Sequence, residues 1–260
     1  MLAILSPAKT LDFTPSPRRL PHTIPALLSD SELLIDVLDT KSEAQLEKLM
    51  KISNKLAVLN RTRYRDWCTP FTPENSRQCL LAFRGDVYQG LKADTFKKGD
   101  FAYAQKHLRI LSGLYGILRP LDLIQAYRLE MGTSLKTKRG ENLYDFWSGR
   151  ITEELTSALT AQRGQHLVNL ASNEYFKAVR LKRLHAEVFT PVFKDWKNGQ
   201  YKLISFFAKK ARGMMADYII RNRLKHPDEL RGFDSAGYGF NPDLSDDFTL
   251  TFTRDAPPAA

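Results

Sequence analysis

The sequence predicts an α+β fold, in which a mixed β-sheet that contains a β-hairpin is surrounded by helices. Three observations support this class. The 260 residues are 43% hydrophobic and 26% charged, which is enough to bury a sizeable core. Apolar runs typical of strands alternate irregularly with helical periods. Asn198-Gly199 supplies the positive φ angles of a tight hairpin turn. Because there is no internal repeat and no long linker, we expect one domain over residues 1–260.

Strands and helices follow from these periods. Apolar or alternating runs predict strands at 2–5, 166–170, 188–193, 201–207 and 248–252. Helical periods predict helices at 31–38, 42–65, 100–107, 143–161 and 211–224. The segment 42–65 divides into two short helices joined by a tight turn. Ser42 and Gln45 have the spacing of a capping box for the first, and Asn54 is the expected cap of the second.

The formal net charge of +10 favours a polyanionic partner. The excess is concentrated between Lys177 and Arg231, where 14 basic residues stand against 5 acidic ones. A solvated basic surface that keeps the protein soluble explains the same charge, and both explanations stay open.

Several classes of protein and site are disfavoured. No apolar run is long enough to span a bilayer, and the apolar start ends too soon at Ser6-Pro7 for a signal peptide. We therefore expect a cytoplasmic protein with no membrane partner. Cys68, Cys79 and five scattered histidines have no metal-ligand or catalytic spacing, so no metal and no cofactor is predicted. The sequence leaves open whether either cysteine is redox-active, because exposure and thiolate pKa decide that.

Three polar segments follow predicted strands, at 6–10, 173–177 and 209–212. The last stands at an expected helix start, where amide groups would favour an anion. Each segment alone also fits an ordinary solvated loop. Because open sheets gather ligands at strand ends, we expect the three to form a basic cleft. The predicted cleft residues are Ser6, Lys9, Thr10, Arg128, Lys177, Lys209, Lys210 and Arg212.

The helix pair at 42–65 resembles a helix-hairpin-helix element, with apolar or small residues at the expected positions. Lys51 and Ser53 replace the two glycines whose amides normally face a DNA phosphate, which weakens amide donation but adds an ammonium and a hydroxyl group. Two packed helices that serve only as core are the alternative. The residues predicted to contact DNA are Lys51, Ser53, Asn54, Lys55, Arg61 and Arg63.

Six motifs in order along the chain resemble the bacterial peroxide-stress protein YaaA family. They are MLAILSPAKTLD (1–12), FRGDVY (83–88), LSGLYGILRPLD (111–122), YRLEMG (127–132), NLASNEYF (169–176) and SFFAKKAR (205–212). The resemblance implies a cytoplasmic protein that protects bacteria from hydrogen peroxide, in part by keeping free iron low. It also implies an α/β fold with a positively charged cleft and a helix-hairpin-helix element, and DNA binding. Without ligand spacing in the chain, an effect on iron would be indirect.

Two functions stay open, with a purely interaction role as a third. In the first, the protein binds double-stranded DNA without marked sequence specificity through the helix pair and the cleft. In the second, it is an enzyme that acts on a small anionic or nucleotide-like substrate. Glu130 or Glu174 would be its acid or base, and Lys9 its anion clamp. The predicted pocket for that substrate consists of Lys9, Thr10, Tyr115, Arg128, Glu130, Glu174 and Lys177. The oligomeric state is not predicted.

Overall fold

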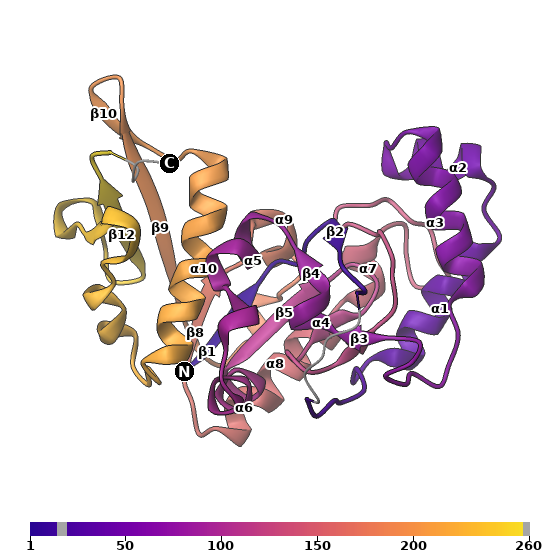
Figure 1. The fold of residues 1–260 in the computed structure, drawn as a ribbon, viewed down its shortest axis with the longest axis horizontal. Helices are drawn as coiled ribbons and strands as arrows, with labels where there is room; N and C mark the ends of the chain where they lie inside the picture. The colour runs from indigo at the N-terminus through magenta and orange to yellow at the C-terminus, as the bar shows by residue number, and fades with distance from the viewer. Residues whose placement is uncertain (15–19, 257–260) are drawn as a thin grey trace.

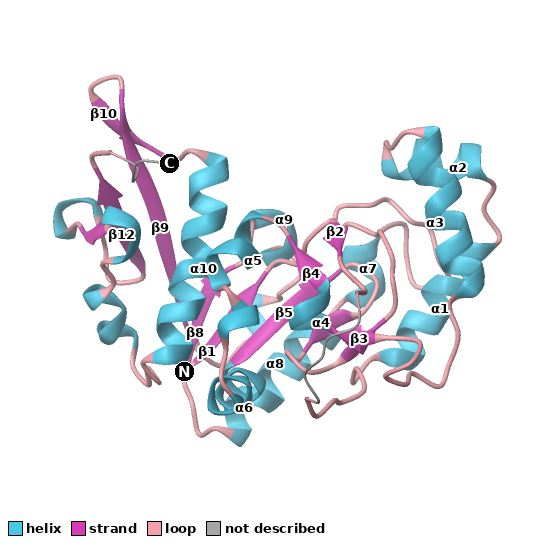
Figure 2. Ribbon diagram, viewed as in Figure 1, coloured by secondary structure: helices cyan, strands magenta, loops and turns pink. Residues whose placement is uncertain are grey.

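The computed structural model describes residues 1–14 and 20–256. In this part of the chain, eight strands form one mixed sheet with helices around it (Figure 1, Figure 2). The strands are β1 (Leu2–Leu5), β2 (Thr10–Leu11), β3 (Arg77–Gln78), β4 (Phe83–Arg84), β5 (Leu108–Ser112), β6 (Gly116–Leu118), β7 (Leu123–Ile124), β8 (His166–Leu170), β9 (Glu187–Lys197), β10 (Gln200–Lys202), β11 (Gly239–Phe240) and β12 (Thr249–Arg254). The α-helices are α1 (Leu28–Asp39), α2 (Glu43–Met50), α3 (Asn54–Asp66), α4 (Cys79–Ala82), α5 (Asp86–Leu91), α6 (Lys98–His107), α7 (Leu143–Trp147), α8 (Arg150–Ala161), α9 (Asn173–Phe176) and α10 (Ser205–Arg221).

The large sheet has the order β11-β12-β9-β8-β1-β5-β6, and β10 pairs with β9. Its central strands β5, β1, β8, β9 and β12 run parallel, while β6, β10 and β11 add antiparallel pairs. The mixed sheet is confirmed, but its parallel centre makes the fold α/β instead of the predicted α+β. Local patterns could not show this, because β1 pairs with residues more than a hundred positions away, such as Leu108 opposite Ala3.

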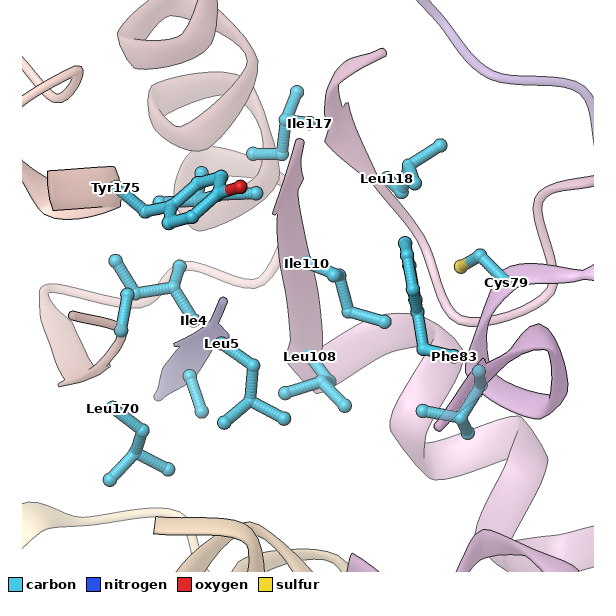
Figure 3. Close-up of a cluster of buried hydrophobic side chains, with 14 of the residues drawn as sticks. Ile4, Leu5, Cys79, Phe83, Leu108, Ile110, Ile117, Leu118, Leu170 and Tyr175 are labelled. Carbon is cyan, nitrogen blue, oxygen red and sulfur yellow. The ribbon is translucent and has the colours of Figure 1, made fainter. Parts of the chain in front are cut away.

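The strand β1 is the middle of the core. All four of its residues are buried, as expected for a strand with both faces covered. Figure 3 shows Ile4 and Leu5 of β1 in one cluster with Leu108 and Ile110 of β5 and Leu170 of β8. Apolar packing on both faces therefore fixes where β1 ends and its polar loop begins.

The predicted hairpin is confirmed, but its second strand is shorter than expected. Asn198 and Gly199 have φ angles of 53° and 77°, and Trp196 lies opposite Tyr201. The strand β10 ends at Lys202, and α10 begins at Ser205, six residues before the predicted start at 211. The residues 209–212 therefore lie inside α10, where backbone amides are already bonded within the helix. The predicted anion site at a helix N-terminus is wrong for this reason.

The other predicted elements are present with two corrections. The expected helix at 143–161 is two helices, α7 and α8, because Ser148 has a φ of 42° and ends the first. The capping box of Ser42 and Gln45 is confirmed. Asn54 does not cap α3: it is the first helical residue, and its side-chain amide donates to Glu47.

Close contact between α5 and α10 positions the basic residues of α10. Gly90 of α5 lies against the backbone of Lys210, and Gly213 of α10 lies against the backbone of Val87. A Cβ atom at either glycine would overlap a carbonyl oxygen of the other helix. Backbone cannot move aside as a side-chain tip can, so this spacing requires glycine on both helices.

We predict that Gly213→Ala lowers the free energy of unfolding by about 3 kcal/mol, because the added methyl group pushes the two helices apart. Gly239→Ala is the matched control, since nothing lies within 4 Å of the position of its added Cβ atom. The control is expected to change stability by less than about 0.5 kcal/mol. Urea unfolding of both variants measures the difference, and equal stabilities would contradict the packing argument.

Candidate functional site

A cleft of about 490 Å³ opens where β1 and β8 end. The two strands are parallel neighbours, so their following loops meet, as predicted from the sequence. The hydroxyl group of Ser6 donates to the Ser172 hydroxyl at 3.3 Å and accepts from the Ser172 amide at 2.9 Å. The lining includes five basic and three acidic side chains: Lys9, Arg84, Arg128, Lys209, Arg212, Asp86, Glu130 and Glu174.

The structure brings most of the predicted site residues together in this cleft, including Ser6, Thr10 and all three acid, base or clamp candidates. It does not bring Lys177, Lys210 or Tyr115 there. The ammonium group of Lys177 lies 5.0 Å from the centre of the Tyr144 ring and lines another hollow. Lys210 is exposed on α10, one helical position from the cleft-lining Lys209. Tyr115 is buried, and its hydroxyl group donates to the Gln125 carbonyl group.

The segment FRGDVY (83–88), which forms β4 and the start of α5, lines one side of the cleft. Sequence reasoning did not predict this. Arg84 is anchored there by Asp12 at 3.0 Å and Asp94 at 2.7 Å. The Tyr88 hydroxyl group donates to the Ser6 carbonyl oxygen at 3.1 Å. The motif was visible in the sequence, but nothing local indicated that it lies against the loop after β1.

Three buried tyrosines, Tyr88, Tyr127 and Tyr175, line the inner part of the cleft. Burial is the main cause that raises the pKa of each phenol well above its ordinary value. These phenols stay neutral at physiological pH, so they provide apolar ring surface without adding charge.

Glu130 lies between two cations. Its Oε1 atom is 3.0 Å from Nζ of Lys9 and 3.2 Å from a guanidinium nitrogen of Arg128. Both Arg128 and Glu130 side chains are about four-fifths buried, at 19% and 22% exposure, whereas Lys9 is 65% exposed. The carboxylate therefore neutralises a cation inside the cleft and holds a second one at its mouth.

Glu174 has a different environment on the same side of the cleft. Its Oε1 atom accepts from the Gly132 amide at 2.9 Å, and its carbonyl oxygen accepts from the Tyr144 hydroxyl group. The residue is exposed, so one face of the carboxylate stays open to a ligand or to solvent.

A second hollow of about 600 Å³ connects the cleft with the helix pair. Glu130 and Glu174 line both spaces, and the far side of the second is formed by α2 and its C-terminal end. The basic residues on that side are Lys41, Lys48 and Lys51. Tyr64 of α3, which is buried, donates its hydroxyl proton to the Arg128 carbonyl oxygen and so fastens the helix pair to the cleft.

The tight turn predicted between the two helices lies between Met50 and Asn54. Lys51 ends α2 with a φ of 52°, the left-handed conformation that glycine favours, and Ser53 precedes α3 without capping it. Lys51, Ser53, Asn54, Lys55 and Arg61 are exposed.

Arg63 does not share that surface. It donates to Asn60 at 3.2 Å and lines a hollow on another side, where burial lowers its pKa. Residues two apart on a helix point in nearly opposite directions, which separates Arg63 from Arg61.

The two cysteines have contrasting surroundings. Cys68 is exposed, whereas Cys79 is buried with its thiol group directed at the carbonyl oxygens of Arg119 and Pro120. Burial is the main cause that raises the pKa of Cys79 well above its ordinary value. Among residues 1–14 and 20–256, no three histidine, cysteine or acidic side chains are grouped to hold a metal ion. Within the same residues, no helix has the length and apolar character needed to cross a membrane.

Comparison with known proteins gives full-length matches. A family model described as peroxide stress protein YaaA matches residues 1–244. A UPF0246 protein of Cellvibrio japonicus is 55% identical over 257 residues, which cover 99% of this chain and 100% of that protein. A UPF0246 protein of Colwellia psychrerythraea is 54% identical over 98% of this chain and 99% of its own length. For a UPF0246 protein of Alteromonas mediterranea the identity is 56%, with 98% of each chain covered.

We predict that Glu130→Gln lowers the free energy of unfolding by about 2 kcal/mol, because Arg128 then keeps a largely buried charge without a counter-charge. Glu141→Gln is the matched control, since Glu141 pairs with Lys136 at the surface with 71% of its side chain exposed. The control is expected to cost less than about 0.5 kcal/mol. Denaturant titration compares the two, and a control as damaging as Glu130→Gln would show that burial of the pair is unimportant.

We predict that a thiol-alkylating reagent modifies Cys68 and spares Cys79 in the native protein, because the buried thiol is neither accessible nor ionised. Intact mass spectrometry should find one adduct under native conditions and two in denaturant. Two adducts on the native protein would contradict the buried, protonated state of Cys79.

Proposed function

The chain belongs to the peroxide stress protein YaaA family, and from this premise we propose that it binds the backbone of double-stranded DNA during peroxide stress. Binding occurs in the bacterial cytoplasm without marked sequence specificity and helps to limit iron-dependent oxidative damage. The helix pair α2–α3 acts as the helix-hairpin-helix-like element, and the exposed cations at the mouth of the cleft extend its contact with phosphates.

One observation carries this proposal: the tip of the helix pair and the cleft open on adjoining hollows that share Glu130 and Glu174. Lys48 and Lys51 are exposed on one side, and Lys9 and Lys209 are exposed on the other. Cations distributed along such a surface can neutralise several phosphates of one duplex and release their counterions.

The conformation of the tip supports the same reading. Lys51 adopts the backbone conformation that a hairpin glycine would adopt. At the start of α3, the amide groups of Asn54 and Lys55 have no acceptor among the described residues, whereas those of Leu56 and Ala57 donate to the Ser53 carbonyl oxygen. A phosphate near Ser53 would therefore meet amide donors together with an ammonium group. The departure from glycine at 51 changes the side chain but preserves the turn.

The cleft interior favours a second candidate, catalysis on a small anionic substrate. Glu130 is held at 3.0 Å by Lys9, and Glu174 lines the same cleft, so the cleft carries more polar groups than contact with a DNA backbone requires. One carboxylate could act as a base while Lys9 orients the anion. The first requirement of this candidate is an anion subsite inside the cleft.

We predict that affinity for a labelled duplex, measured by fluorescence anisotropy, falls steeply with salt, with log K decreasing by about 0.9 for each neutralised phosphate per unit of log salt. Lys51→Ala and Lys209→Ala are each expected to reduce this slope by about one unit.

Lys98→Ala is the matched control for that series. Lys98 is also exposed, but it lies away from the cleft. Its neighbour Gly99 is close to Arg223, which follows the C-terminal end of α10, whereas Lys209 lies near the N-terminal end of that helix. The control should leave the slope unchanged. Duplex affinity that is insensitive to salt, or equally reduced by all three substitutions, would rule out binding at this surface.

A further inference from the structure

Arg212 is an unpaired cation inside the cleft. It lies in the third turn of α10, is partly buried and lines the cavity. Among the residues that the structure describes, it has no hydrogen bond and no ion pair. Burial alone lowers its pKa, and no neighbouring charge opposes that effect.

Several other partly or fully buried arginines have counter-charges, and Arg63 and Arg109, which have none among the described residues, donate hydrogen bonds to neutral oxygen atoms. Arg254 pairs with Asp195, Arg77 lies 3.3 Å from Asp12, and Arg128 lies 3.2 Å from Glu130. Taking a guanidinium group out of water without a counter-charge costs free energy. Among the described residues Arg212 has neither a counter-charge nor a hydrogen bond, and its side chain lines a cavity large enough for a ligand.

The groups around the cleft suit a phosphate. Lys209 provides a second cation, and the hydroxyl groups of Thr10 and Ser172 line the same cavity. The Ser172 hydroxyl accepts from Ser6, so its own proton can be donated to a phosphate oxygen. A phosphate monoester presents several oxygen acceptors, and the planar guanidinium group binds two of them at once.

The rest of the cleft limits what the phosphate can be attached to. Glu130, Glu174 and Asp86 would repel a polyanion that ran through the interior, but they accept hydrogen bonds from amino or hydroxyl groups. The rings of Tyr127 and Tyr175 add flat apolar surface to the lining of the cavity. A volume of about 490 Å³ is in the range of small-molecule sites.

We propose that the cleft binds a nucleotide-like phosphate monoester, with Arg212 as the bidentate anchor of the phosphate and the acidic residues as acceptors for its polar end. The same chemistry is offered by a free nucleoside monophosphate and by the 5′-phosphate of a DNA end. The second source rests on the DNA-binding function proposed above, whereas the first does not.

The test is isothermal titration of the full chain with deoxyadenosine monophosphate and with deoxyadenosine. The monophosphate is expected to bind at least about tenfold more tightly. Arg212→Met should weaken its binding by about tenfold or more, and Arg212→Lys, which keeps the charge but loses the fork, should lie between. Lys210→Met is the matched control on the same helix, because Lys210 is exposed and does not line the cleft.

Thermal unfolding without ligand separates a binding role from a structural one. An unpaired guanidinium group destabilises the free protein, so Arg212→Met should melt at the same temperature as the unmodified chain or higher. A clear fall in its melting temperature, or an unchanged affinity for the monophosphate, would overturn the proposal.

Duplexes with and without a 5′-phosphate distinguish the two sources. A 5′-phosphate that raises affinity in the unmodified chain but not in Arg212→Met identifies a DNA end, and equal affinities identify a free small molecule. Lys51→Ala should weaken both duplexes and leave the monophosphate unaffected, so loss of DNA binding and loss of the anion subsite give different results. Failure of both the monophosphate and the 5′-phosphate to bind preferentially would contradict the subsite.

Discussion

The parallel pairing of β1 with β5 and β8 is the constraint on which the site depends. Four apolar residues paired with a strand on each side fix the register of β1, since a shift along the chain would bring polar Ser6 into the core in place of an apolar residue. The loop after β1 begins with polar Ser6, and the loop after β8 carries Ser172, at the same edge of the sheet. The cleft is therefore a direct result of where two apolar strands stop.

The charges of the cleft are of two kinds, and the difference determines what each can do. Arg84 and Arg128 are held by carboxylates, so they shape the walls and contribute little free positive potential. Arg212 has no such partner among the described residues, and Lys209 is exposed beside it. A count of basic residues does not separate these groups, whereas the pairing found in the structure does.

Much of this arrangement was predictable from local pattern, and the exceptions have physical reasons. Apolar runs located β1 and β8, Asn198-Gly199 located the hairpin, and parallel strand ends indicated the cleft. The predicted start of α10 is too late because Phe206 and Phe207 continue the apolar pattern of the preceding strand. Tyr115 is predicted in the cleft but lies in the core, where its hydroxyl group exchanges hydrogen bonds with the backbone of Gln125. A local pattern around Tyr115 does not indicate this contact.

The two kinds of ligand proposed here need not compete for the same atoms. A duplex cannot enter a cavity of about 490 Å³, so its phosphates would meet only the exposed groups at the mouth and on the helix pair, such as Lys9 and Lys51. Arg212 is less exposed and lines the same cavity as three neutral tyrosines, so a single phosphate with a small organic group can reach it. The outer cations act through long-range attraction that salt screens, and the inner cation acts through short hydrogen bonds in a less polar environment. The same groove can therefore hold a polyanion along its rim while its interior recognises one terminal phosphate.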